Sequence, residues 1–316
     1  MSKTLLDDSL SGNHDKLEVR LKSMTPIHIS KNLKLQGHFY YLPFRNHQAT
    51  VDEFVDFLFH RIAHFCIPAK ELKKAFKKSQ DENDARYTGE LLEKAKNLFL
   101  QGREQKKTSG EPGELVLFSI LEGKLKAPIV VSKMYLKTNT SMPVHGTDGI
   151  HVLWDEERKD IVLLWGEVKI YKSFSKAVTS LCASITKFIS DEEKRSPKQR
   201  DIEIIQDHIS IENEELKTLI LKKFDPYDES SNTRNEAYAC LIGFDYEPLK
   251  KCKSQADEDI FLENYQNWLV KAVANVEEKI TTSKIHQLEY HLFLVPFSCV
   301  AEFRKKFFTR LGVSGD

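Results

Sequence analysis

Asp148, Glu167 and Lys169 are residues whose types and spacing favour chemistry. Asp148 precedes the apolar run GIHVLW, and Glu167 and Lys169 lie within the apolar run LLWGEVKIY. Charged groups inside a buried strand are costly unless they are paired or bind a metal ion. Two neighbouring carboxylates also repel, which raises the pKa of one of them unless a cation lies between them. A hard divalent ion such as Mg²⁺, with Mn²⁺ as the alternative, suits carboxylate oxygens.

A β-hairpin would bring these three residues together. Two apolar runs, Ile150 to Trp154 and Ile161 to Tyr171, lie on either side of a polar loop and predict antiparallel strands. In one register Asp148 faces Glu167, with Cβ atoms roughly 5 Å apart on one face. Lys169 points to that face because side chains alternate along a strand. A register shifted by one residue would separate the two carboxylates, so the predicted site depends on this pairing.

Glu114 is a further acidic candidate. A helix is predicted from about Pro112 to Glu122, and Glu114 lies on its apolar stripe with Leu117, Phe118 and Leu121. Two interpretations stay open. The side chain points inward to an acidic cluster, or it is a first-turn glutamate that complements the helix macrodipole.

Lys133, His145 and His151 are weaker candidates for contacts to a substrate. Lys133 lies on a predicted strand, KAPIVVSKMYLK, and the two histidines lie on either side of Asp148. A lysine at this place could contact phosphate, but a solvated lysine at a strand edge is the alternative. For the histidines a structural role is the alternative.

Two other patterns are better explained as ordinary structure. His60 and His64 are four positions apart on a predicted helix, which is a metal-ligand spacing, but no third ligand lies near them in the sequence. The basic helices Lys70 to Lys78 and Arg304 to Arg310 are candidate surfaces for DNA or a partner protein. Such runs are more often solvated faces.

Composition limits the class of protein. The chain has 316 residues, 41% hydrophobic and 30% charged, and its 47 basic residues balance its 47 acidic residues. A nucleic-acid surface would therefore be a local patch. The five cysteines form no CxxC pair, which argues against a disulfide framework and a cysteine zinc site. We expect a cytoplasmic protein, because no signal peptide or run approaching the roughly 20 apolar residues of a membrane span is found.

Hydrophobic periodicity and turn residues predict the other elements. Residues 1–14 are predicted to form a loose tail and residues 101–113 a linker. The predicted strands are 17–29, 37–44, 126–137, 236–244 and 289–297. The predicted helices are 51–66, 70–78, 84–100, 112–122, 175–190, 202–224, 258–280 and 301–311, and residues 191–201 are predicted to be a charged loop. We expect a small α+β module, residues 1–105, followed by an α/β domain, residues 106–316, with a mixed sheet flanked by helices.

The candidate residues together resemble a known nuclease superfamily. A helix glutamate, then an aspartate, then E-x-K on the next strand is the pattern of PD-(D/E)xK nucleases, here with Thr147-Asp148 in place of Pro-Asp. The segments GELVLFSILE, SKMYLKT, VHGTDGIHVLW and WGEVKIYKSFSKAV resemble the HamA family, the nuclease subunit of the Hachiman anti-phage defence system. The resemblance extends from about residue 110 to the C-terminus and is poor over the first hundred residues.

This resemblance implies a restriction-endonuclease-like fold and a Mg²⁺-dependent DNase that works with a helicase, HamB. By analogy Asp148, Glu167 and the Val168 carbonyl hold the ion, and Glu114 completes the acidic cluster or holds a second ion. Lys169 then orients the attacking water and stabilises charge on the phosphate. The sequence has no Gly-x-x-x-x-Gly-Lys-Ser/Thr loop, so we expect no nucleotide cofactor in this chain and an ATPase motor in the partner.

Other functions remain open at this point. The chain could be a non-catalytic adaptor that binds DNA or regulates a helicase, or a standalone restriction or repair endonuclease. An adaptor would usually have lost part of the acidic cluster, and here Glu114, Asp148, Glu167 and Lys169 are all present. We expect the first 105 residues to bind the helicase.

Overall fold

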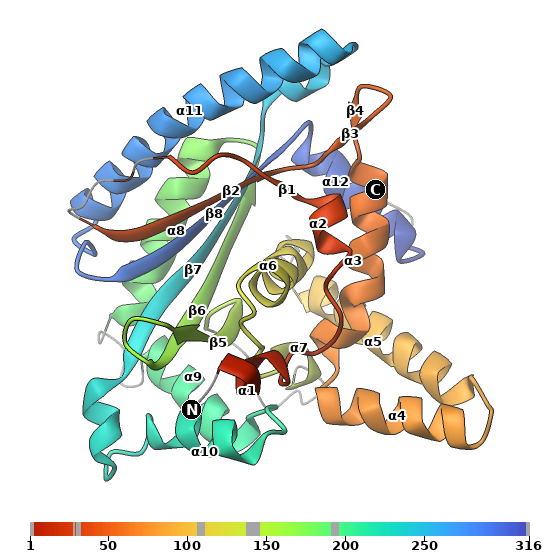
Figure 1. Ribbon diagram of the computed structural model, residues 1–316, viewed down its shortest axis with the longest axis vertical. Helices are drawn as coiled ribbons and strands as arrows, with labels where there is room; N and C mark the ends of the chain where they lie inside the picture. Colours follow the sequence, from red (N-terminus) through yellow and green to blue (C-terminus); the bar gives the residue numbers. More distant parts are fainter. Residues whose placement is uncertain are drawn as a thin grey trace. The chain divides into compact units, whose positions relative to one another are not determined.

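The computed structural model describes residues 3–27, 29, 33–105, 111–136, 146–190 and 196–313 (Figure 1). The side chains of residues 101–105 and 111 lie outside this description. Within these ranges no helix has both the length and the apolar character needed to cross a bilayer.

A mixed sheet is the central element of the described chain. Six strands form it in the order β1-β2-β8-β7-β6-β5, and β3 and β4 form a separate two-stranded sheet. Strand β2 is antiparallel to β1 and parallel to β8, and β8 is parallel to β7. The strands are β1 (Lys22–Ser23), β2 (Lys34–Tyr41), β3 (Phe44–Arg45), β4 (Gln48–Ala49), β5 (Gly149–Asp155), β6 (Asp160–Tyr171), β7 (Asn235–Asp245) and β8 (Glu289–Phe297).

Helices make up most of the remaining structure. They are α1 (Lys3–Asp7), α2 (Leu17–Arg20), α3 (Val51–Cys66), α4 (Ala69–Asp81), α5 (Arg86–Gln105), α6 (Glu111–Lys124), α7 (Lys133–Leu136), α8 (Phe174–Ile189), α9 (Pro197–His208), α10 (Glu214–Lys222), α11 (Gln255–Thr282) and α12 (Val300–Arg310). Two short 3₁₀ helices are η1 (Glu229–Thr233) and η2 (Glu247–Lys251). This mixed α/β architecture confirms the predicted fold class.

The chain divides into two compact units. Unit 1 comprises residues 1–14, 60–165 and 188–236, and unit 2 comprises residues 15–59, 166–187 and 237–316. The division passes through β6, between Trp165 and Gly166. The predicted boundary between residues 105 and 106 stays a prediction.

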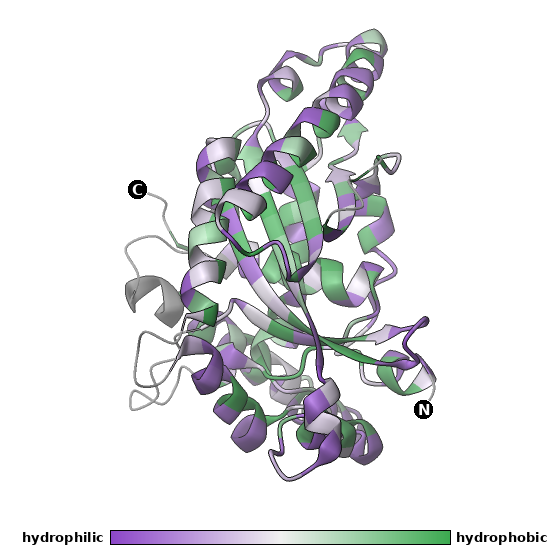
Figure 2. Ribbon diagram, turned by 90° about the vertical axis from the view of Figure 1, so that its left-hand side faces the viewer, coloured by the Kyte–Doolittle hydropathy of each residue, from purple (hydrophilic) through white to green (hydrophobic). Residues whose placement is uncertain are grey.

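Unit 2 buries strands β7 and β8 between helices on both faces. Phe244 of β7 contacts Phe174 of α8 and Trp268 of α11. Phe297 of β8 lies on the opposite face and contacts Phe303 of α12. Strands covered on both faces have near-continuous hydrophobic sequences, and Figure 2 shows hydrophobic colouring along the long strands of the sheet.

Unit 1 is built around α6. This helix is apolar on nearly all sides, and its residues 112–122 are buried. Phe118 of α6 packs against Phe65 of α3, and α6 also contacts α5 and β5. A helix that is hydrophobic all round is surrounded by other elements, so polar residues on α6 must find partners inside the protein.

Several predicted elements are confirmed. Helix α3 has the predicted bounds, and so does β8. The hairpin of β5 and β6, the strand β7 and the helices α6, α8, α11 and α12 agree with prediction to within a few residues. Long periodic segments with clear breaks between them carry enough local information for these predictions.

Other local predictions are wrong. The predicted strand at residues 126–137 is not formed in the described part of this range, because Ile129 makes an isolated bridge to His151 and α7 begins at Lys133. The expected N-terminal tail contains α1 and a buried His14. The expected strand at residues 17–29 is α2 followed by the two-residue strand β1.

The charged segment after α8 also differs from prediction. Of the expected loop at 191–201, residues 191–195 lie outside the described residues, and α9 begins at Pro197. The helical region 202–224 is two helices, α9 and α10. Ser196 caps α9 by accepting a hydrogen bond from Gln199, and Asn213 caps α10 in the same way. These Ser-Pro and Asn-Glu sequences are helix start signals that could have corrected the prediction.

Candidate active site

Strand β6 places Glu167 and Lys169 side by side in unit 2. Lys169 Nζ donates to Glu167 Oε1 in an ion pair, and the two side chains are only 15% and 11% exposed. Residues two apart on a strand share a face, so this pair confirms that Lys169 points to the same side as Glu167. The neighbouring Val168 and Ile170 are buried. The strand therefore presents one carboxylate and one ammonium group within apolar surroundings.

The thiol of Cys240 lies near this ion pair. Burial raises its pKa well above the usual value, and the charge of Glu167 raises it further. Burial likewise raises the pKa of Cys182. Because the thiolate is the form that attacks carbon or binds metal, both cysteines are unsuited to either task. The oxygen atoms of β6 are therefore the metal donors that this part of unit 2 offers.

Asp148 lies directly before β5 in unit 1, and its backbone is held through Thr147. Thr147 N and Oγ1 donate to Asp201 Oδ2 over 2.9 and 2.8 Å. Asp148 itself is half-buried. Thr147, the residue before Asp148, is thus fixed by hydrogen bonds to both its backbone and its side chain.

Lys133 is a buried residue of α7 and lies next to Thr147 and Asp201. Its ammonium group donates to Asp201 Oδ1 over 2.7 Å and to the Thr147 carbonyl over 2.8 Å. The prediction that Lys133 lies on a strand is wrong, because α7 begins at this residue. The ammonium group is already bound by groups of the protein, so in this conformation it is not available to a phosphate.

Glu114 is buried on α6, as the apolar stripe predicts. It lies in the first turns of that helix, so the structure is compatible with both interpretations of this residue. Sequence reasoning missed a second buried acid on the same helix, Glu122, which is fully enclosed. Its position two turns after Glu114, among apolar residues, is the signal that could have drawn attention to it.

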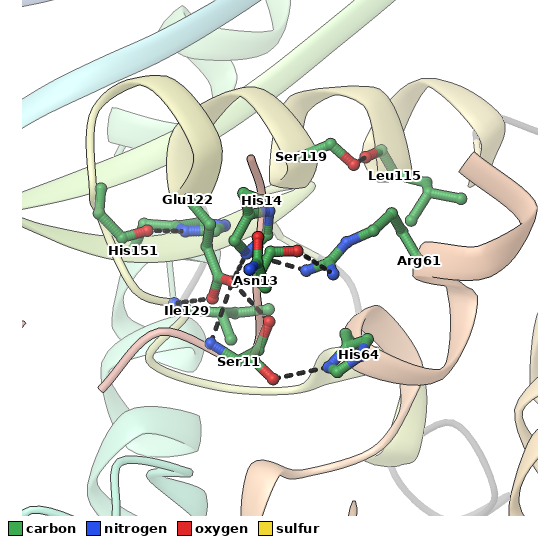
Figure 3. A network of polar contacts seen from close by, with 11 residues as sticks. Ser11, Asn13, His14, Arg61, His64, Leu115, Ser119, Glu122, Ile129 and His151 are labelled. Atoms are coloured by element: carbon green, nitrogen blue, oxygen red, sulfur yellow. Dashed lines mark hydrogen bonds and ion pairs between the residues drawn. The ribbon is translucent and has the colours of Figure 1, made fainter. Parts of the chain in front are cut away.

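Glu122 is the centre of a buried polar network (Figure 3). Glu122 Oε2 accepts hydrogen bonds from Ser11 N and shares one with His14 Nε2, and Oε1 accepts from Ile129 N. Burial alone would raise the pKa of Glu122, but the bonds from His14 and Ser11 outweigh it and lower the pKa. The carboxylate is thus charged and satisfied, which is the requirement for a buried acid.

His64 and His151 belong to the same region. His64 Nδ1 donates to the Ser11 carbonyl over 2.6 Å, and burial lowers its pKa to about 4. His151 Nδ1 donates to the Ala127 carbonyl over 2.8 Å, and burial lowers its pKa too. Both rings are neutral and have structural partners. His145, the third of the weaker candidates, lies outside the described residues.

The predicted site residues are distributed over both units. Glu114 and Asp148 belong to unit 1, and Glu167, Val168 and Lys169 belong to unit 2. The structure brings Glu167 and Lys169 together, and the pairing of Asp148 with Glu167 stays a prediction. Across the described ranges, no group of three or more His, Cys, Asp or Glu side chains is arranged to hold a metal ion. The fit to Mg²⁺ rests on donor chemistry, since every candidate donor is an oxygen atom.

Comparison with known proteins identifies a family. A family model described as HamA matches residues 19–311 of the 316-residue chain. A comparison with curated proteins gives no match. The matched segment includes the N-terminal residues in which the sequence resemblance is poor, as well as all the candidate site residues.

Proposed function

The chain belongs to the HamA family, and we propose that it is a metal-dependent DNA nuclease that acts with a helicase partner. Membership in this family supports a role in anti-phage defence related to Hachiman. Within that role, the proposed task of this chain is to hydrolyse DNA phosphodiester bonds.

The ion pair between Lys169 and Glu167 carries this proposal. A buried ion pair is often no more stabilising than a well-packed apolar pair of the same volume. Such a pair inside an apolar strand therefore supports a use other than folding. Hydrolysis of a phosphodiester needs both groups, because a carboxylate can bind a metal ion and an ammonium group can neutralise a phosphate.

The proposed metal ligands are Asp148, Glu167 and the Val168 carbonyl, and Glu114 completes the acidic cluster or holds a second ion. These are hard oxygen donors, and the nearby Cys240 thiol is kept neutral by burial and does not compete with them. When bound, Mg²⁺ or Mn²⁺ lowers the pKa of a water molecule and draws charge from the phosphate oxygens.

Lys169 has a different task from the carboxylates. Its ammonium group stabilises the negative charge that develops on the phosphate and orients the attacking water. In the ion pair its positive charge also compensates the negative charge of Glu167 within apolar surroundings. The short distance along β6 between the two residues lets one rigid strand position both groups.

Plasmid cleavage tests this proposal. Purified chain is incubated with DNA and Mg²⁺ or a chelator, with and without its neighbour-encoded helicase, and phage plating is measured in parallel. Glu167→Gln should abolish Mg²⁺-dependent cleavage and protection. Glu156→Gln is the matched control, because Glu156 is an exposed acid in the β5–β6 turn that pairs with Lys159. If Glu167→Gln protects cells as well as the parent does, the chain is a non-catalytic adaptor.

The helicase arm of the experiment separates two forms of the nuclease. Cleavage by the chain alone would identify a standalone endonuclease, whereas cleavage only with the helicase and ATP supports an effector complex. Binding to the helicase is measured separately by pull-down with residues 1–105 deleted, provided that the truncated chain folds.

A further inference from the structure

Asp201 of α9 is a buried carboxylate that the proposed chemistry does not use. Its side chain is 0% exposed and accepts three hydrogen bonds of 2.7–2.9 Å. They come from Lys133 Nζ and from the backbone and hydroxyl of Thr147. Among the described residues, these bonds direct a fully enclosed charge to Lys133 and Thr147, which indicates a specific task at that place.

Lys133 completes the arrangement from the other side. Besides Asp201, it donates to the carbonyl and to Oγ1 of Thr147, over 2.8 and 3.2 Å. The three N–H groups of the ammonium thus have three acceptors. All three polar groups of Thr147 are bound by the Asp201–Lys133 pair, which fixes the orientation of both peptide planes next to this residue.

Gly146 brings the chain close to the same carboxylate. Its φ is +150°, and a Cβ atom added there would lie 2.4 Å from Asp201 Oδ1. A side chain at this position would displace the carboxylate, so only glycine allows so close an approach. The chain entering β5 therefore passes close to Asp201 at Gly146 and is bound by it at Thr147.

Asp148 is the next residue, and it is a proposed metal ligand. We propose that Asp201 and Lys133 are positioning residues that fix the backbone at Thr147 and so set the direction in which Asp148 presents its carboxylate to the metal ion. This inference rests on the proposed function. It assigns Lys133 to positioning through Thr147 in place of contact with substrate. Groups that orient a metal ligand typically affect metal affinity or activity by roughly 10–100-fold.

Mn²⁺ binding to the full chain, measured by electron paramagnetic resonance, tests the proposal without relying on cleavage. Thr147→Val removes the hydroxyl at nearly constant volume, and Thr147→Ser keeps it. We expect Thr147→Val to weaken Mn²⁺ binding about tenfold, Asp201→Asn by at least as much, and Thr147→Ser by no more than about twofold. Lys198→Met is the matched control, because it removes another ion pair of α9, with Glu236, and should leave Mn²⁺ affinity unchanged.

Hydrogen exchange gives a second measurement. The Thr147 amide donates to Asp201, so exchange in the segment from Gly146 to Ile150 should accelerate in Asp201→Asn and stay at the parent rate in Lys198→Met. If Asp201→Asn does not fold, the two Thr147 variants still decide the question.

Two failures are distinguishable. If the parent does not bind Mn²⁺, or if Glu167→Gln binds it as well as the parent does, both the proposed function and this inference are wrong. If the parent binds Mn²⁺ and Glu167→Gln releases it, but Thr147→Val and Thr147→Ser bind it equally well, only the positioning role is wrong.

Discussion

Glu122 Oε2 lies 2.7 Å from Nε2 of His14, a hydrogen bond that joins residues 108 positions apart. It attaches the N-terminal segment to α6 inside unit 1. Removing the carboxylate leaves the His14, Ser11 and Ile129 donors without their acceptor, and buried donors without acceptors are costly. We expect Glu122→Ala to lower the free energy of unfolding by about 3–5 kcal/mol.

Urea unfolding of Glu122→Ala measures this loss. Glu156→Ala is the control, because an exposed ion pair screened by water contributes little to stability. A loss for Glu122→Ala no larger than that of the control would show that the network does not stabilise unit 1.

We expect the ion pair between Lys169 and Glu167 on β6 to be needed for DNA cleavage but not for the stability of the fold. Lys169→Met alone leaves Glu167 charged and buried without its cation, which should be destabilising. Glu167→Leu combined with Lys169→Met replaces the pair by apolar groups, and we expect the double variant to be at least as stable as the parent, by up to about 1–4 kcal/mol. DNA cleavage should be lost in both variants. Thermal unfolding and plasmid cleavage check this, and a double variant less stable than the parent would contradict it.

Metal removal provides a further prediction. An ion that binds the folded chain and not the unfolded chain stabilises it, by about 2.7 kcal/mol when its concentration is 100 times the Kd. We expect Mn²⁺ to raise the melting temperature of the parent and a chelator to reverse the change. Calorimetry of Glu167→Gln should show no such increase. An equal increase in parent and variant would place the ion elsewhere.

His38 predicts the response of unit 2 to acid. Burial, and then the neighbouring His291, lower the pKa of His38 to about 4 from 6.5. The unfolded chain therefore binds a proton at a higher pH than the folded chain does. Stability that is present above pH 6.5 is lost progressively as the pH falls from 6.5 to 4.

The loss attributable to His38 is about 2 kcal/mol between pH 7 and pH 5. His38→Phe should remove that part of the pH dependence, because phenylalanine can retain the stacking on Phe293 without binding a proton. Urea unfolding at the two pH values checks this. His286→Gln, at an exposed residue, serves as control, and equal slopes for parent and His38→Phe would disprove the assignment.

Sequence patterns were sufficient where local information determines the structure. The apolar stripe of α3 and the continuous apolar run of β8 have their predicted bounds. The E-x-K spacing correctly placed Glu167 and Lys169 on one face, because strand alternation is a purely local property.

Long-range partners explain the wrong predictions. The run before Lys133 has the composition of a strand, but Lys133 is bound by Asp201, 68 positions later, where the chain turns into α7. The polar N-terminal residues looked like a tail because their partner, Glu122, is distant in sequence. Asp201 falls in the predicted charged loop at 191–201, and no local pattern indicates its bonds to Thr147. Pairings of this kind are set by tertiary structure and have no periodic signal.

The parallel pairing of β2 with β8 also affects how the protein is made. His38 and His291, on these two strands, are 253 positions apart. At a translation rate of 5–20 residues per second, β2 waits roughly 12–50 s for its neighbour. During that interval its unpaired edge is available to other nascent chains, so we expect overproduced protein to aggregate unless synthesis is slowed or a chaperone protects the strand.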